Sequence, residues 1–412
     1  MELQTKASRK SLREHNQTLV FQTIYNCRST TRVEVAEKTE LTRTTVAAVV
    51  DDLIKNHLVE DTGKPRTSRE RTPSLGRIPT SIRVLKDGRH IIAVDVSHEE
   101  LTGALINLRG DIKDRIITQL DKQDEANIQD QILDFINNLK RASKRTKLLG
   151  IGLSMTGVVN SDTGVLLVAN RLRGLSNIRF RDILKGQHDS LPVYVMNNGQ
   201  ALVLGEYSKM EGEPPVTNLI AIRTGSGIGG GLILDGKVFH GDGYGAGEFG
   251  KNVVECYRGN YRNLSSVAID EAIIERAKKY ASKDPASTLD EKLSSKIEHE
   301  VAFKHIADAA RNGDTVAKDT IEEIGRYFGR AIGYMVNILN IQHIIVSGKI
   351  SVFGDRLRDE MVKEMERFSE MALASHTKIQ IVPSDVDKYL IGAATPLLTH
   401  EFGIPRFVPD RS

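Results

Sequence analysis

The sequence predicts an α/β protein that begins with a small winged helix-turn-helix domain. Apolar residues recur at helical spacing between residues 15 and 54, and a short strand-like run follows them. A basic, proline-containing stretch separates this part from the rest of the chain. In the rest, strand-like apolar runs alternate with amphipathic helical segments, which is typical of a layered α/β fold.

The composition predicts a soluble protein of two or three domains. A chain of 412 residues is too long for one ordinary core, and its 40% hydrophobic and 27% charged residues are typical of globular proteins. The segment Met1–Lys6 lacks the apolar core of a signal peptide, and no apolar run is long enough to span a bilayer. We therefore expect a cytoplasmic protein with no membrane partner. Cys27 and Cys256 form no disulfide framework or metal-binding pair of cysteines.

The first part of the chain has the pattern of a DNA-binding domain. Helices are predicted over residues 15–27 and 33–39, with a break near Glu40, and Thr42 is placed to cap a third helix. The apolar face of that helix contains Val46, Val49, Val50, Leu53 and Ile54. Its opposite face begins with Arg43, Thr44 and Thr45, the positions that a helix-turn-helix presents to base edges. The run Leu58–Gly63 then predicts a strand and turn, the candidate wing.

The charge distribution favours a polyanion partner for this part. Residues 1–90 contain 17 Lys and Arg against 11 Asp and Glu, whereas the remainder is slightly acidic. Residues 63–79 include three prolines and five basic residues and are predicted to be a linker. Arg77 either enters a minor groove, as basic arms do, or belongs to a solvated hinge. The candidate DNA-binding residues are Arg32, Thr42, Arg43, Thr44, Thr45 and Arg77.

Beyond residue 80 the apolar pattern predicts further strands and helices. Strands are expected at residues 81–84, 90–96, 101–108, 148–155, 192–196 and 343–347. Helices are expected at about 124–145, after Asn197–Ala201, and at about 268–280, 299–311, 314–340 and 354–373.

The stretch Asn218–Lys251 contains the most distinctive pattern. An apolar run leads into the glycine-rich loop Thr224–Gly231, and a second apolar pair leads to a hairpin turn at Asp235–Gly236. Glycines let backbone N–H groups converge on an anion such as phosphate. Further on, Glu248 lies between glycines, where its carboxylate could accept hydrogen bonds from a polyol. Together these features suggest a sugar site beside a phosphate site.

An ordered series of motifs resembles the ROK family, which groups bacterial sugar-responsive repressors with sugar kinases on an actin-like, hexokinase-type fold. The series comprises Gly152–Val159, Leu191–Asn198, Thr224–Gly231, Gly245–Lys251 and Ile344–Gly348. The N-terminal helix-turn-helix is found in the regulator branch, whose members respond to sugars such as xylose, N-acetylglucosamine or glucose. The resemblance implies a winged helix-turn-helix domain over 1–63, a linker and wing return over 64–88, lobe one over 89–198 with 385–412, and lobe two over 199–384.

The chain departs from the kinases of the family at the positions that perform catalysis. The Asp that accepts the proton of the sugar hydroxyl in those kinases is matched by Asn198, whose amide has no useful basicity. Where the kinases carry a phosphate loop after a strand, this chain has Asp95 followed shortly by Glu99 and Glu100, which would repel ATP. Ser347–Gly348–Lys349 replaces a Gly-Gly pair. We therefore expect no enzyme activity, no catalytic residue and no cofactor.

The zinc site of the family is also missing. The resemblance places Lys251, Cys256, Arg258 and Asn263 where the family has one His and three Cys ligands. Lys and Arg are cations and do not bind Zn²⁺, so no metal is expected. Ser265 stands where the family has a Glu.

The resemblance places the remaining ligand-binding residues at Gly157, Asn170, Asn197, Asn198, Glu248 and Lys251. Lys251 replaces a His and puts a positive charge beside Glu248. Either the two form a salt bridge that fills an empty site, or they recognise an anionic ligand such as a sugar phosphate or sugar acid. The residues are also compatible with binding of a neutral sugar and with a vestigial pocket.

These inferences predict a DNA-binding transcriptional regulator of carbohydrate genes, a repressor controlled by a sugar or sugar derivative in the interlobe cleft. A palindromic operator favours a homodimer or homotetramer. Two different functions remain open, a sugar kinase with a tethered DNA-binding head and a regulator that is controlled by a transport-system protein.

Overall fold

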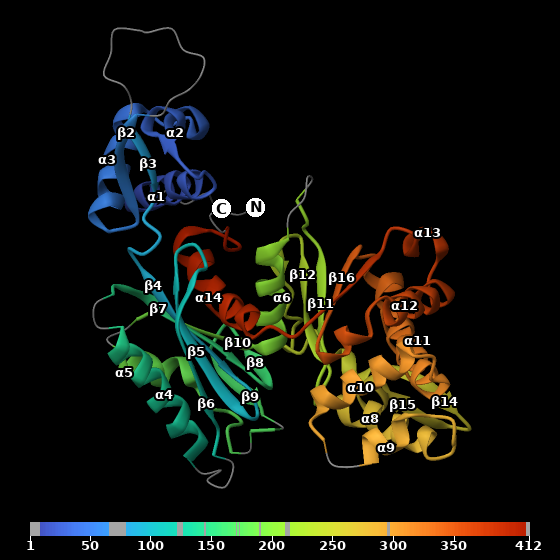
Figure 1. The fold of residues 1–412 in the computed structure, drawn as a ribbon. Helices are drawn as coiled ribbons and strands as arrows, with labels where there is room; N and C mark the ends of the chain where they lie inside the picture. The colour runs from blue at the N-terminus through green and yellow to red at the C-terminus, as the bar shows by residue number, and fades with distance from the viewer. Residues whose placement is uncertain are drawn as a thin grey trace. The chain divides into compact units, whose positions relative to one another are not determined.

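The computed structural model describes residues 9–65, 80–121, 127–143, 146–169, 171–172, 174–188, 191–210, 215–294 and 297–408. The chain divides into two compact units, Met1–Met196 with Leu390–Ser412 and Asn197–Tyr389 (Figure 1). Among the described residues, no helix has both the length and the apolarity to cross a bilayer.

The first unit begins with three helices and a small sheet, which we call the head (Arg9–Val84). Its helices are α1 (Arg9–Tyr25), α2 (Arg32–Thr39) and α3 (Arg43–Lys55), and its strands are β1 (Thr30–Thr31), β2 (Val59–Pro65) and β3 (Thr80–Val84). The sheet has the order β1-β3-β2.

Local sequence explains how the helices of the head begin and end. Thr31 and Glu34 form a capping box at the start of α2, in which each side chain accepts the other residue's N–H. Glu40 ends α2 in the left-handed conformation, and Thr42 caps α3 by accepting the N–H of Thr45 at 3.2 Å. The predicted break near Glu40 and the predicted cap at Thr42 are confirmed.

The two long strands of the head form an antiparallel pair. Val59 pairs with Val84 and Pro65 with Thr80, so residues 66–79 join two strands of one sheet. The predicted linker 63–79 thus falls largely between β2 and β3, and the chain leaves the head after Val84. Residues 66–79, Arg77 among them, lie outside the described residues.

A five-stranded sheet in the order β10-β7-β4-β5-β6 forms the centre of the rest of the first unit. Its strands are β4 (His90–Val96), β5 (Glu100–Asn107), β6 (Ile112–Gln119), β7 (Leu148–Met155) and β10 (Val193–Asn197), and β4 pairs parallel with β7 but antiparallel with β5. The helix α4 (Ile128–Ala142) packs so closely on Gly103 that a Cβ there would lie 2.5 Å from Leu139. The helix α14 (Val386–Phe402) packs against Gly152 of β7. The strands β8 (Val158–Asn160) and β9 (Val165–Val168) form a hairpin, and α5 (Phe180–Gln187) follows.

A second five-stranded sheet, β13-β12-β11-β16-β17, organises the second unit. Its strands are β11 (Leu219–Arg223), β12 (Gly229–Leu234), β13 (Lys237–Val238), β16 (His343–Ser347) and β17 (Lys378–Val382). The helix α6 (Asn198–Lys209) packs on β11 and β12. Alternate sheet residues such as Ile220, Ile222 and Val346 share a core with the helices that follow in sequence. These are α7 (Leu264–Ala268), α8 (Asp270–Ala281), α9 (Leu289–Ser294), α10 (His299–Arg311), α11 (Thr315–Leu339), α12 (Gly354–Phe368) and α13 (Met371–Ala374).

Candidate functional site

The N-terminal end of α3 presents a cluster of hydroxyl groups. The Oγ1 atom of Thr42 lies 2.9 Å from that of Thr44 and 2.8 Å from that of Thr45. Because Thr42 also caps the helix, these side chains are fixed at the end where the helix has unpaired N–H groups and partial positive charge. Such an end attracts phosphate.

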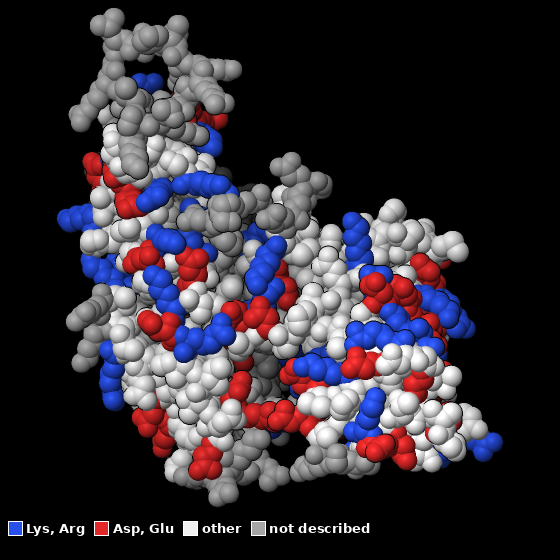
Figure 2. All heavy atoms as spheres, in the orientation of Figure 1, with Lys and Arg blue, Asp and Glu red and all other residues white. Residues whose placement is uncertain are grey.

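Arg43, the first residue of α3, is exposed beside this cluster. Within the described ranges it forms no ion pair, so its guanidinium can bind a base edge or a phosphate without breaking an internal contact. Figure 2 shows Lys and Arg interspersed with Asp and Glu on the visible face of both units. Binding to DNA would therefore depend on a few placed residues such as Arg43 rather than on one broad basic patch on that face.

Arg32 has a different environment from Arg43. Its guanidinium donates to Asp61 at 2.9 Å and to Asp51 at 3.2 Å, which links α2 to β2 and to α3. Burial is the largest single influence on Asp61 and would raise its pKa, but hydrogen bonds from Arg32, the Gly63 N–H and Thr80 outweigh it and hold the pKa below its usual value. Arg32 thus has a bridging role within the head in addition to any contact with DNA.

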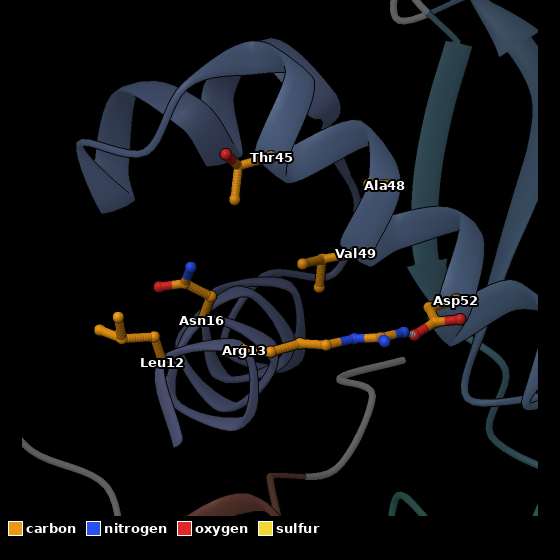
Figure 3. A pocket seen from close by; sticks show the side chains of 7 residues that line it. All are labelled: Leu12, Arg13, Asn16, Thr45, Ala48, Val49 and Asp52. Atoms are coloured by element: carbon orange, nitrogen blue, oxygen red, sulfur yellow. Dashed lines mark hydrogen bonds and ion pairs between the residues drawn. The ribbon is translucent and has the colours of Figure 1, made fainter. Parts of the chain in front are cut away.

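A groove between α1 and α3 adjoins the hydroxyl cluster, and the sequence did not reveal it (Figure 3). It has a volume of about 440 Å³, and an ion pair of 2.6 Å between Arg13 and Asp52 crosses it. Its lining residues are Leu12, Arg13, Asn16, Thr45, Ala48, Val49 and Asp52. Thr45 belongs both to the groove and to the predicted DNA-binding face.

In the second unit, the glycine-rich loop connects β11 to β12 as predicted. Thr224 fixes its start because both its N–H and its hydroxyl donate to Ser347 O, at 2.8 and 3.2 Å. The segment around Gly247 packs onto β12 so closely that a Cβ at Gly247 would collide with Gly230 O. Gly199 of α6 approaches the same carbonyl, so the residues after Asn197 and those before Glu248 lie next to one strand.

Glu248 and Lys251 are both exposed at the short helix η2 (Phe249–Lys251). The Lys251 N–H donates to Glu248 O at 3.0 Å, but the two side chains form no ion pair with each other or with other described residues. The salt bridge between them, one of the two alternatives from the sequence, is not formed among the described residues. These residues are three apart on a short 3-10 turn, and the backbone contact leaves both charged ends in solvent.

Asn197 and Asn198 lie where β10 ends and α6 begins. The Asn197 side chain accepts the Gly199 N–H at 2.7 Å, and its own N–H donates to the Gln200 side chain at 3.4 Å, so Asn197 caps α6. Asn198 is 8% exposed. An amide at this position cannot accept a proton from a substrate hydroxyl.

In the first unit, Gly157 has φ of 133°, and a Cβ there would collide with Val168 O. This close backbone approach requires glycine. Asn170 lies outside the described residues. In the β4–β5 turn the Ser97 hydroxyl accepts the N–H groups of Glu99 and Glu100 at 3.2 and 2.9 Å, so the hydroxyl occupies the anion-binding N–H groups of that turn.

The positions of the family's zinc ligands have other roles in this chain. Cys256 is exposed on the hairpin of β14 (Val253–Tyr257) and β15 (Asn260–Asn263), and Arg258 lies over the Tyr257 ring at 5.2 Å. Asn263 caps α7 by accepting the Ser266 N–H at 2.8 Å. Two of the four positions are cations, so these residues do not fit a zinc ion.

Lys349, in the segment Ser347–Lys349 that stands where the kinases have a Gly-Gly pair, forms a contact that the sequence did not predict. Its ammonium donates to Asp270 Oδ2 at 3.0 Å, and His299 Nδ1 lies 3.7 Å from the same oxygen. Asp270 is fully buried, and its backbone N–H donates to Gly225 O at 2.9 Å. The ion pair thus connects α8 to the residues after β16, and the backbone hydrogen bond of Asp270 connects α8 to the glycine-rich loop.

The chain is similar to known proteins over most of its length. The chain is 27% identical over 405 residues to the xylose repressor of Caldicellulosiruptor bescii, and the match covers 96% of this chain and 98% of that protein. It is 28% identical over 313 residues to the glucokinase of Halalkalibacterium halodurans, with 74% of this chain and 93% of the glucokinase covered. A crystal structure of a ROK family transcriptional regulator, a homologue of the E. coli MLC protein, superposes with a TM-score of 0.79 at 23% identity and covers 96% of this chain and 97% of that one.

The structural likeness shows an α/β fold of the actin-like kinase type. Residues 91–398, which include most of both five-stranded sheets, match the ROK family, and the chain belongs to that family.

Proposed function

We propose that the protein is a DNA-binding transcriptional repressor of carbohydrate genes that responds to a sugar or an anionic sugar derivative. The head is a winged helix-turn-helix, and α3 enters the major groove with Arg43, Thr44 and Thr45 leading. The observation that carries the proposal is the capped, exposed N-terminal end of α3, with an arginine that has no internal ion pair within the described ranges.

The extent of the similarity supports a regulator over a kinase. The match to the ROK family starts at residue 91, after the head, and the match to the glucokinase covers 74% of the chain. The match to the xylose repressor covers 96% of the chain, so it extends over the head as well. A homodimer would present two heads to a palindromic operator.

The ligand contacts are proposed from unpaired groups in the second unit. Glu248 offers carboxylate oxygens to hydroxyl groups, and Lys251 offers an ammonium to a phosphate or carboxylate. Because neither side chain is used in an ion pair within the described residues, both charges are available to a ligand. This favours a sugar phosphate or sugar acid over a vestigial site.

The test is to mix the purified chain with fragmented DNA of its own genome at a fixed, near-physiological salt concentration and to sequence the retained fragments. We expect a few palindromic sites next to carbohydrate genes, whose products then suggest the effector to test. Salt must be fixed because phosphate contacts make the affinity steeply salt-dependent. Uniform retention, or none, would refute specific recognition by the head.

A sugar kinase is the second candidate, and the similarity to a glucokinase favours it. The decisive assay measures ADP release with hexoses and pentoses for the wild type and for Asn198→Asp. We expect no turnover by the wild type, because Asn198 cannot act as a general base. Turnover by the wild type would support the kinase, and turnover by the variant alone would show that only the base is missing.

A further inference from the structure

The head and the first-unit sheet share one hydrophobic core. Phe21 and Tyr25 of α1 are fully buried in a cluster that also contains residues of β4, β5 and α14. The Phe21 ring packs on that of Phe402, the last residue of α14, with 4.5 Å between ring centroids. A domain that shares a large apolar core with its neighbour is held in place, unlike one on a flexible tether.

Arg109 lies at the centre of this joint. It is 3% exposed, in the turn between β5 and β6, where the Asn107 side chain accepts its N–H at 2.9 Å. Its guanidinium donates to the carbonyls of Tyr25 at 2.7 Å, Cys27 at 3.3 Å and Val408 at 3.2 Å. It also lies over the Tyr25 ring, 4.5 Å from the centroid.

The position of Arg109 matches what the end of a helix requires. The last carbonyls of α1 have no partners within the helix and carry partial negative charge. Arg109 donates to Tyr25 O, the last carbonyl of α1, and to Cys27 O just beyond the helix, which its rigid fork can reach together whereas an ammonium has no such fork. Arg109 therefore ties the end of α1, the β5–β6 turn and the C-terminal segment together.

Two further residues of α1 reinforce the same joint. The Tyr25 hydroxyl donates to Leu108 O at 2.9 Å and accepts the Val408 N–H at 3.3 Å. The Gln22 amide donates to Phe402 O and to Gly403 O, each at 2.9 Å. These hydrogen bonds of Gln22 and Tyr25 are all made to backbone atoms outside the head. The joint therefore specifies an orientation of the head rather than a loose attachment.

We propose that Arg109 is a positioning residue for operator recognition: through Tyr25 and the segment Phe402–Val408 it fixes the orientation of the head on the first unit. In a dimer, two heads fixed in this way match only half-sites at one spacing. This inference rests on the proposed DNA-binding function, but the geometry of the joint can be measured without DNA.

The DNA test compares affinity for a selected operator with affinity for the same operator carrying two extra base pairs between its half-sites. Two base pairs rotate one half-site by about 70° relative to the other. We expect the wild type to lose about tenfold or more in affinity on respacing. Arg109→Gln should lose only about twofold or less in affinity on respacing. It should also bind the native operator about tenfold more weakly than the wild type does, because a mobile head is no longer preorganised for its half-site.

Affinity for a single half-site separates positioning from a general defect. It should stay within about twofold of the wild type in Arg109→Gln, because α3 itself is unchanged. The matched control is Arg141→Gln, an exposed arginine in the last turn of α4. A variant that keeps the wild-type penalty for respacing would overturn the proposal.

The physical test measures the distance between spin labels on Lys55→Cys in the head and Arg179→Cys before α5, in a background with Cys27→Ser and Cys256→Ser. We expect a narrow distribution for the wild-type joint and a broad one for Arg109→Gln. If Arg109→Gln fails to fold, Tyr25→Phe and Gln22→Ala each remove part of the joint and should broaden the distribution less. Unchanged distance distributions in these variants would refute the proposal even if operators are found. If no operator is found, the distance distributions still test the joint, because they are measured without DNA.

Discussion

Arg43 and Arg32 show how the same residue type serves different ends within one small domain. Both are candidate DNA-binding residues from the sequence, but Arg32 is engaged by Asp51 and Asp61 whereas Arg43 has no ion pair in the described ranges. The pairing of Arg32 depends on β2, which lies 29 residues from it in sequence, so local pattern could not reveal it. The cap by Thr42 was predictable because it depends only on the next three residues.

The first prediction concerns Arg43. Arg43→Ala should weaken binding of a selected operator by about 1–3 kcal/mol per head, because one charge-assisted contact to DNA is lost. Lys55→Ala, at the other end of α3, is the control and should change affinity little. Gel-shift titrations at one salt concentration measure both. Equal effects of the two changes would remove Arg43 from the recognition surface.

The second prediction concerns the two unpaired charges of the second unit. Glu248→Ala should abolish release from the operator by the effector and leave affinity for the operator unchanged, because the carboxylate contacts ligand only. Lys251→Gln should weaken the response to an anionic effector but not to a neutral sugar. Lys237→Gln, an exposed lysine of β13, is the control. Loss of DNA binding in Glu248→Ala would contradict the assignment.

Among the elements, those with a clear apolar period and clear end signals were predictable. The helices α2 and α3 and the strand β16 lie where the sequence places them. The strand β6 was missed because all but its first residue are exposed, so it shows no apolar alternation. The helix α14 was missed because it contains Gly392 and Pro396, which normally weaken or break helices. The packing of α14 on β7 outweighs that preference.

The third prediction concerns the start of α11, the longest helix described. Asp314 caps it by accepting the Ala317 N–H at 3.0 Å, and it also accepts the Thr288 N–H at 2.7 Å and the Ser287 hydroxyl at 2.9 Å. Asp314→Ala should lower the free energy of unfolding by about 1 kcal/mol, which corresponds to a Tm lower by about 2–4 °C. Thermal unfolding followed by circular dichroism measures it.

The pH dependence of this effect follows from the pKa of Asp314. Burial is the largest single influence and would raise the pKa, but the hydrogen bonds from Ala317, Thr288 and Ser287 together hold it below 3.8. The carboxylate therefore stabilises the fold above pH 3.8, and this stability is lost as the pH falls through the lower folded-state pKa. The Tm difference between wild type and Asp314→Ala should shrink in that range. A difference that persists at still lower pH would show that charge is not involved.

At the scale of the whole molecule, regulation requires that ligand and operator act on the same equilibrium. The fourth prediction is that operator DNA weakens effector binding by the same factor by which the effector weakens operator binding, because the coupling free energy is reciprocal. Calorimetric titrations of the effector with and without saturating operator measure it. An effector affinity that saturating operator leaves unchanged would mean that the effector site and the operator site are not coupled.

The ROK family and its α/β fold were predictable because the family's motifs occur in order along the chain. The joint between the head and the sheet was not, since it brings Gln22 against Gly403, 381 residues away. Its hydrogen bonds pair side chains with backbone carbonyls or, for Tyr25, also with the Val408 N–H, and residues of almost every type carry these backbone groups. Such contacts are visible only once the fold has brought the segments together.

The same joint has a consequence for the synthesis of the protein. Tyr25 and its partner Val408 lie 383 residues apart, so Val408 is made long after Tyr25. The apolar face of α1 therefore stays uncovered while the intervening chain is made, and the slowest contacts to form are those of greatest sequence separation. A chain truncated before Phe402 would carry a complete α3 on a head that lacks these contacts, so truncation there should leave the orientation of α3 unspecified.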